Sequence, residues 1–276
     1  MSGAMERGLL VTSLALYAAA ALGYGMLWLR GARALRHVPV AIMCAAVGLN
    51  AVAVASRWIE AGRPPFKTLQ ESLVLLAACI ALVHLVVEAG HRMRVIGLPA
   101  ALASAASILY ALVQMDREVA RMPAALQSGW FIPHVVVYFF GYASLVAAAG
   151  AAAVYLVHPD PIAHGREHVL GSASVDLSAW MSGAVRFGFV LLTVGLAIGA
   201  VWAKDAWGDY WSWDPKETWA LVTWLVYAAH IHLEKVAGWR GRRLAIVVIA
   251  GMAAVLFTFL GMSLLPTTEG SLHSYQ

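Results

Sequence analysis

Eight apolar runs follow one another along this 276-residue chain, and each is long enough to cross about 30 Å of hydrocarbon as a helix. A soluble domain of this size would not bury a chain that is 61% hydrophobic and only 12% charged. We therefore predict an all-α fold, a polytopic transmembrane helix bundle of about eight spans that forms a single integral membrane domain over residues 1–276. The runs lie near residues 8–29, 38–59, 69–87, 95–113, 132–157, 184–203, 216–233 and 244–264.

The basic residues predict how the spans are oriented, because Lys and Arg are enriched in loops on the cytoplasmic side. With eight spans, the connections near 30–37, 88–94, 158–183 and 234–243 share one side. Together with Arg186 they carry eleven of the nineteen basic residues, so we expect this side to be cytoplasmic and both termini to be extracytoplasmic. The net charge of +4 reflects this skew, and no basic stripe with aromatic stacking positions indicates a nucleic-acid partner.

The only two cysteines, Cys44 and Cys79, lie inside separate apolar runs. They form no CxxC pair, so the chain has no thiol–disulfide motif of its own. We interpret both side chains as small apolar filler in the helix packing.

A tryptophan cluster at one membrane surface is the clearest functional signal. Residues 202–224 hold six of the eleven tryptophans, interleaved with Asp205, Asp209 and Asp214. A belt of interfacial aromatics is ordinary, because indole is apolar with one polar N–H group, but six in one short stretch exceed what anchoring needs. Such a surface on the extracytoplasmic side suits a large, flat, mostly apolar ligand with a charged edge, for which haem is the obvious candidate.

The start of the seventh run has a clear local structure. Asp214 is a good N-cap, Pro215 suits the first helical turn and Glu217 falls at the third position, which together predict a capping box. The loop before it would then be attached to a rigid helix start. A capped helix with an interfacial aromatic belt is the simpler interpretation of the same residues.

Four histidines are candidate iron ligands. His134 lies where the fifth run leaves the outer surface, and His273 follows the eighth run on the same side, as two axial ligands of a six-coordinate haem would require. His232 and His84 lie within apolar runs near their cytoplasmic ends, where an ionisable group is a functional candidate. His230 points to another side of its helix, and we interpret it as a packing residue or as a support for a ligand. The alternative for His84 is a hydrogen bond to a neighbouring helix.

Several segments resemble the CcsA (ResC) family of cytochrome c biogenesis proteins, which carry a tryptophan-rich WWD domain. The family signature is similar to the segment WGDYWSWDPKETWALVTWLVYAAHIH. The segments around the family's two external histidines resemble ALQSGWFIPHVVVYFFGYASL and SLHSYQ, and its outer loop before the third span resembles RPPFKTLQESL. The likeness extends from about residue 50 to the end of the chain.

The resemblance implies a role for each matching residue. His134 and His273 would be the external haem ligands and His232 the intramembrane one. In this family a further membrane histidine comes from a partner, CcsB (ResB); no such domain is present here, so either a separate partner supplies it or His84 substitutes. The haem-binding part of the external loop, within residues 202–219, would comprise Trp207, Gly208, Tyr210, Trp211, Trp213, Asp214 and Pro215.

The function implied is export of haem b, bound as a substrate, and its presentation for covalent attachment to the CxxCH motifs of apocytochrome c. The chain would be a haem lyase (synthase) subunit, with a CcsB partner and thiol-reducing proteins, in the bacterial cytoplasmic (inner) membrane with its active site on the extracytoplasmic side. Two alternatives remain: a membrane b-type cytochrome that transfers electrons between haems, and a haem-dependent regulator or scaffold.

Overall fold

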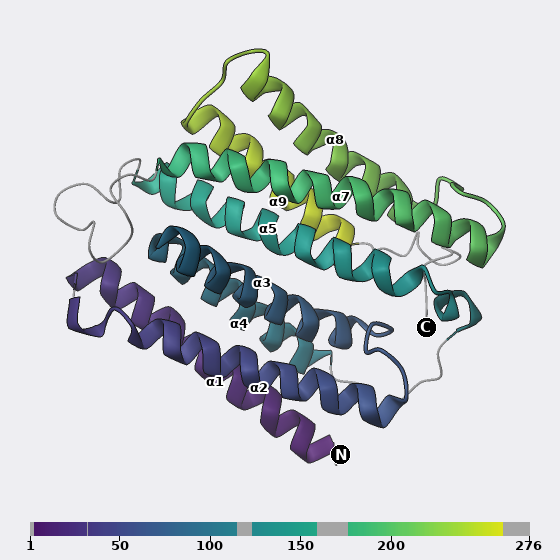
Figure 1. Cartoon of the computed structure of the whole chain (residues 1–276), viewed down its shortest axis with the longest axis horizontal. Coiled ribbons are helices and arrows are strands. Elements are labelled where there is room, and N and C mark those ends of the chain that lie inside the picture. Colours follow the sequence, from purple (N-terminus) through teal and green to yellow (C-terminus); the bar gives the residue numbers. More distant parts are fainter. Residues whose placement is uncertain (1–2, 32, 115–122, 159–175, 262–276) are drawn as a thin grey trace. The chain divides into compact units, whose positions relative to one another are not determined.

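The structure, a computed structural model, describes residues 3–31, 33–114, 123–158 and 176–261 (Figure 1). It divides into two compact units: unit 1 contains Met1–Ala120 and Val157–Ala179, and unit 2 contains Arg121–Leu156 and Trp180–Gln276. All regular structure in the described ranges is helical. The long helices are α1 (Gly3–Arg30), α2 (Val38–Ala61), α3 (Leu69–His91), α4 (Gly97–Val113), α5 (Phe131–Val157), α7 (Leu177–Trp207), α8 (Pro215–Lys235) and α9 (Arg242–Phe259), with short 3-10 turns at Arg33–Leu35, Arg94–Ile96 and Ala124–Gln127.

The predicted all-α membrane bundle is confirmed. Among the described residues, seven helices are long and apolar enough to cross a membrane. The helix α8 is not one of them, although the run 216–233 was expected to be a span. Charged residues in its first and last turns, together with His230 and His232, lower the mean hydropathy of this helix. The assignment of both termini to the extracytoplasmic side stays a prediction.

Unit 1 is built from the first four helices. The helix α1 packs against α2 and α4, and α3 also packs against α2 and α4, so each helix has two neighbours. Hydrogen bonds of Asn50 connect α1, α2 and α3 in the core. The Asn50 amide donates to the Tyr17 hydroxyl and to the Val74 carbonyl, both at 3.2 Å. Interhelical hydrogen bonds of this kind satisfy polar groups that lipid cannot hydrate.

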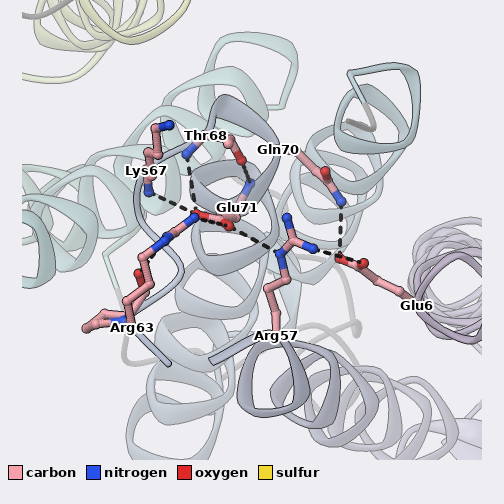
Figure 2. Close-up of polar contacts among 8 residues, drawn as sticks. Glu6, Arg57, Arg63, Lys67, Thr68, Gln70 and Glu71 are labelled. Carbon is pink, nitrogen blue, oxygen red and sulfur yellow. Dashed lines mark hydrogen bonds and ion pairs between the residues drawn. The ribbon is translucent and has the colours of Figure 1, made fainter. Parts of the chain in front are cut away.

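A buried charge network joins α1, α2 and the start of α3, with the Glu71 carboxylate at its centre (Figure 2). Arg63 donates to both carboxylate oxygens of Glu71, at 3.0 and 3.1 Å, and Arg57 donates to one of them at 3.2 Å. Arg57 also pairs with Glu6 at 3.6 Å. The same Glu71 closes a capping box with Thr68, so one side chain starts α3 and fixes the loop before it.

Unit 2 contains α5, α8, α9 and all but the first turn of α7. Glycines bring α5 and α7 together: a Cβ added at Gly188 would lie 2.9 Å from Leu145, and one added at Gly141 would lie 3.3 Å from Leu191. Small residues allow this close approach between membrane helices. The ring of Tyr227 on α8 packs in the same way against Gly251 of α9.

Candidate functional site

The tryptophan loop connects α7 to α8 within unit 2. The helix α7 ends at Trp207, and Gly208 follows in the left-handed region with φ +94°. A glycine is favoured there because it has no Cβ to clash in that conformation. Lys204 caps the end of the helix, since its ammonium group donates to the Gly208 carbonyl and lies 5.7 Å from the centre of the Tyr210 ring. One lysine therefore holds both the helix end and the first exposed aromatic of the loop.

The other end of the loop is fixed by the capping box that the sequence predicts. The Asp214 carboxylate accepts from the Lys216 amide at 3.0 Å, and the Glu217 carboxylate accepts from the Asp214 amide at 3.2 Å. Glu217 also accepts from the Ser212 amide at 2.8 Å. Pro215 is the first residue of α8. Because both carboxylates are buried, the loop backbone is attached to the helix at several points.

Trp213 has the least ordinary backbone of the loop. Its φ is +60°, in the left-handed region that costs a residue with a Cβ about 1–2 kcal/mol. The side chain of Trp213 is nevertheless 68% exposed, and its ring meets that of Trp211 edge-on at 5.7 Å. Tyr210 is also exposed. A strained backbone that presents an indole to the surroundings is typical of a binding site.

His134 lies in the first turn of α5, in contact with α7. Its Nδ1 lies 2.9 Å from the Gly195 carbonyl oxygen. A carbonyl can only accept, so Nδ1 carries a proton, and in the neutral imidazole the lone pair is then on Nε2. The imidazole stacks on the indole of Trp202, with centres 5.5 Å apart and planes 27° apart, and Trp202 in turn meets Trp207 at 4.8 Å. The structure therefore joins His134 to the start of the tryptophan loop through one indole.

His273, the other predicted external ligand, lies outside the described residues. The structure therefore does not describe the two outer imidazoles together. It does bring together, within unit 2, His134 and the aromatic residues that begin the loop.

The two histidines of α8 have opposite environments. His232 is exposed, whereas His230 is fully buried and neither of its ring nitrogens has a hydrogen-bond partner in the described part of the chain. One turn beyond His230, Glu234 is buried and accepts from Arg186 of α7 at 2.7 Å. Burial alone would raise the pKa of Glu234, but the hydrogen bonds and charge of Arg186, together with the charge of Lys235, hold the pKa below its ordinary value.

His84 belongs to unit 1 and is fully buried in a polar cluster. Its Nε2 lies 3.0 Å from the Tyr24 hydroxyl and 3.2 Å from a Glu88 oxygen. The Tyr24 hydroxyl donates to Glu88 at 2.7 Å, and Arg94 pairs with the same carboxylate at 3.0 Å. This cluster joins α1, α3 and the turn before α4, which favours the alternative that His84 bonds neighbouring helices.

Sequence reasoning missed the part of α7 that packs against His134. A Cβ added at Gly199 would lie 2.6 Å from Cε1 of the imidazole, and one added at Gly195 would lie 2.6 Å from the Tyr138 ring. The segment GLAIG at 195–199 has the small-xxx-small spacing of close helix contacts, which is the signal that could have revealed it.

Comparison with known proteins identifies the family of the chain. The model of the family described as "Cytochrome C assembly protein" matches residues 66–268. A "Cytochrome c biogenesis protein CcsA" from Microcystis aeruginosa (strain NIES-843 / IAM M-2473) is 34% identical, over 86% of this chain and 85% of that protein. Proteins of the same name from Synechococcus sp. (strain CC9605) and Mesostigma viride are 36% and 33% identical, over 79% and 82% of this chain and 80% and 82% of theirs.

A solved structure has a fold similar to that of this chain. The "Cytochrome c Heme Lyase CcmF" has a TM-score of 0.62 at 18% sequence identity, and the match covers 94% of this chain and 47% of that one. The family match covers most of the chain, including the tryptophan loop and His134. The chain therefore belongs to the CcsA family of integral membrane proteins in cytochrome c biogenesis.

Proposed function

We propose that this protein receives haem b as a substrate and presents it, on the extracytoplasmic side of the bacterial inner membrane, for covalent attachment to apocytochrome c. Family membership supports a role in cytochrome c maturation and the handling of haem. The observation that carries the finer proposal is the geometry of His134. Its Nδ1–H bond to Gly195 makes Nε2 the nitrogen that would bind a metal, and such a bond makes the imidazole a better ligand.

The tryptophan loop supplies the surface for the porphyrin in this proposal. Trp213 and Tyr210 are exposed, while Asp214 and Glu217 hold the backbone that carries them. A flat, apolar macrocycle can stack on such rings, which would bury its faces and leave an edge open. His273 would provide the second axial ligand from the C-terminal segment.

In the attachment step, each cysteine S–H of the CxxCH motif adds across a vinyl C=C bond of haem. Sulfur bonds to one vinyl carbon and hydrogen to the other, so the addition needs no oxidant. The protein's contribution would be orientation of the ring, control of the iron ligands and exclusion of water. Because Cys44 and Cys79 lie in separate helices, α2 and α3, other proteins would keep the substrate thiols reduced.

His232 would be the inner haem ligand. It is exposed on α8, so a ligand from a separate CcsB-type partner can approach it from outside unit 2. We propose that the partner, and not His84, supplies the further membrane histidine, because the His84 Nε2 already lies between Tyr24 and Glu88.

Co-expression with a CcsB-type partner and an apocytochrome bearing CxxCH tests this function. We expect covalent haem on the cytochrome with the wild-type chain and with His91→Ala, a control at an exposed histidine that ends α3. His134→Ala should abolish most of the covalent product while the protein still inserts into the membrane. Equal yields from His134→Ala and the wild type would contradict the proposal. Reversible redox cycling with a quinone and no covalent product would favour a b-type cytochrome instead.

A further inference from the structure

Two glycines of α7 contact the His134 imidazole, Gly195 through its carbonyl oxygen and Gly199 through the position that a side chain would fill. They lie one helical turn apart and therefore on one face of the helix. A Cβ at position 199 would lie 2.6 Å from Cε1 and 2.7 Å from Nδ1 of His134, closer than real Cβ atoms approach. No residue larger than glycine fits at 199 unless the imidazole moves.

The absence of a side chain at 199 also exposes the acceptor that His134 uses. In a helix, a side chain points toward the N-terminus and covers the preceding turn, so a side chain at 199 would lie over the carbonyl of residue 195. A carbonyl oxygen has two lone pairs, and the helix uses only one of them. Gly199 thus leaves the Gly195 oxygen open to the second bond, which His134 makes at 2.9 Å.

Trp202 fixes the plane of the same imidazole. It is almost fully buried, and its indole N–H donates to the Ala125 carbonyl at 2.9 Å, so the ring that stacks on His134 is itself held in place. The carbonyl sets which nitrogen is protonated, and the indole sets the orientation of the ring. Both come from α7, within two turns of one another.

We infer that Gly195 and Gly199 are positioning residues that make Nε2 of His134 the iron-ligating nitrogen and set the plane of its ring. This inference rests on the proposed function, in which His134 ligates haem. Simple helix packing is the competing explanation. The Gly141 and Gly188 pair provides the comparison, because it brings the same two helices together where no histidine is involved.

The experiment compares Gly199→Ala with Gly188→Ala. The added methyl at 188 would meet Cδ2 and Cγ of Leu145 at 2.9 Å and the Gly141 carbonyl oxygen at 3.3 Å, on the same helix pair but away from His134. The first readout needs no haem: the ring nitrogens of ¹⁵N-histidine-labelled protein in lipid, with the His134 signal assigned by its loss in His134→Gln. The second readout is haem affinity and the iron spin state in the haem-loaded protein.

We expect the wild type and Gly188→Ala to show a neutral His134 with the proton on Nδ1 and to bind haem equally. Gly199→Ala should lose that tautomer and weaken haem binding on the order of tenfold to a hundredfold, as loss of a ligand's supporting hydrogen bond does. A wild-type proton on Nε2 would by itself overturn the inference, with no variant required. It would also be overturned if Gly199→Ala matched the wild type, or if Gly188→Ala lost as much haem.

The haem function and the positioning of His134 can be rejected separately. If the nitrogen signals change as expected in Gly199→Ala but the wild type binds no haem, the positioning of His134 stands and the haem function is rejected. If haem binds to the wild type but the tautomer does not depend on Gly199, the haem function stands and the positioning is rejected.

Discussion

Replacing Glu71 with alanine should strongly destabilise unit 1, because the carboxylate balances two buried guanidinium groups. The Arg57 and Arg63 side chains are only 6% and 9% exposed, and both donate to Glu71 at 3.0–3.2 Å (Figure 2). Glu71 also accepts from the amides of Lys67 and Thr68, at 2.9 and 3.3 Å. The alanine variant therefore loses the central anion and half of the capping box together.

The expected loss of stability in Glu71→Ala follows from the burial of Arg57 and Arg63. Removing one partner of a buried ion pair costs about 3–5 kcal/mol, because the remaining charge is left without compensation. Glu6 offsets part of this for Arg57, at 3.6 Å, but within the described part of the chain the ion pair of Arg63 is with Glu71. For a chain of this size, each kcal/mol lowers the unfolding temperature by about 2–4 °C, so we expect a decrease of roughly 6–20 °C.

A native thiol allows the unfolding temperature of unit 1 to be measured in detergent. Cys79 of α3 is buried and Cys44 is exposed, so in a Cys44→Ser background a thiol-reactive dye reports the opening of unit 1. Apparent unfolding temperatures are compared at one heating rate, since unfolding of such proteins is commonly irreversible. His91→Ala, at an exposed side chain that ends α3, is the control and should shift the transition by about 2 °C or less. A Glu71→Ala transition no lower than that of the control would refute the reasoning.

Three further substitutions test other parts of the structure. Trp213→Gly should raise the unfolding temperature by a few degrees, because it relieves about 1–2 kcal/mol of backbone strain, and should lower haem content; unchanged haem would show that the indole binds nothing. His230→Leu should be at least as stable as the wild type with an unchanged haem spectrum, since it removes about 1–3 kcal/mol of unpaired polar burial; a lower unfolding temperature would reveal a missed partner. Tyr24→Phe should cost about 1–3 kcal/mol in the same dye assay, because Glu88 and His84 lose a bonded hydroxyl, and a wild-type transition would show that their cluster does not stabilise unit 1.

The sequence predicts the fold well because membrane helices are determined by hydropathy. The run 132–157 differs by one residue from α5 (Phe131–Val157), and 69–87 falls within α3 (Leu69–His91). Local hydrogen bonding also determines the start of α8, so its capping box could be read from three residues. The run 216–233 was the difficult case, because histidines and the charged residues at both ends of α8 lower the hydropathy on which the span prediction depends.

The site was less predictable, because the environments of its histidines depend on tertiary packing. His230 and His232 are two residues apart, and the sequence alone does not show that the first is buried and the second exposed. The depth of His84 in its helix suggested a ligand, but the cluster with Tyr24 and Glu88 brings together residues 60 or more positions apart. The contact of Gly199 with His134 likewise needs the packing of α5 on α7.

The absorption spectrum of the purified, reduced protein tests the central claim most directly. We predict the low-spin spectrum of a bis-imidazole haem in the wild type, and its loss in both His134→Ala and His273→Ala, with partial recovery when imidazole is added. His91→Ala should keep the wild-type spectrum. The same spectrum and haem content in His134→Ala as in the wild type would contradict the claim that this imidazole binds haem iron at the tryptophan loop.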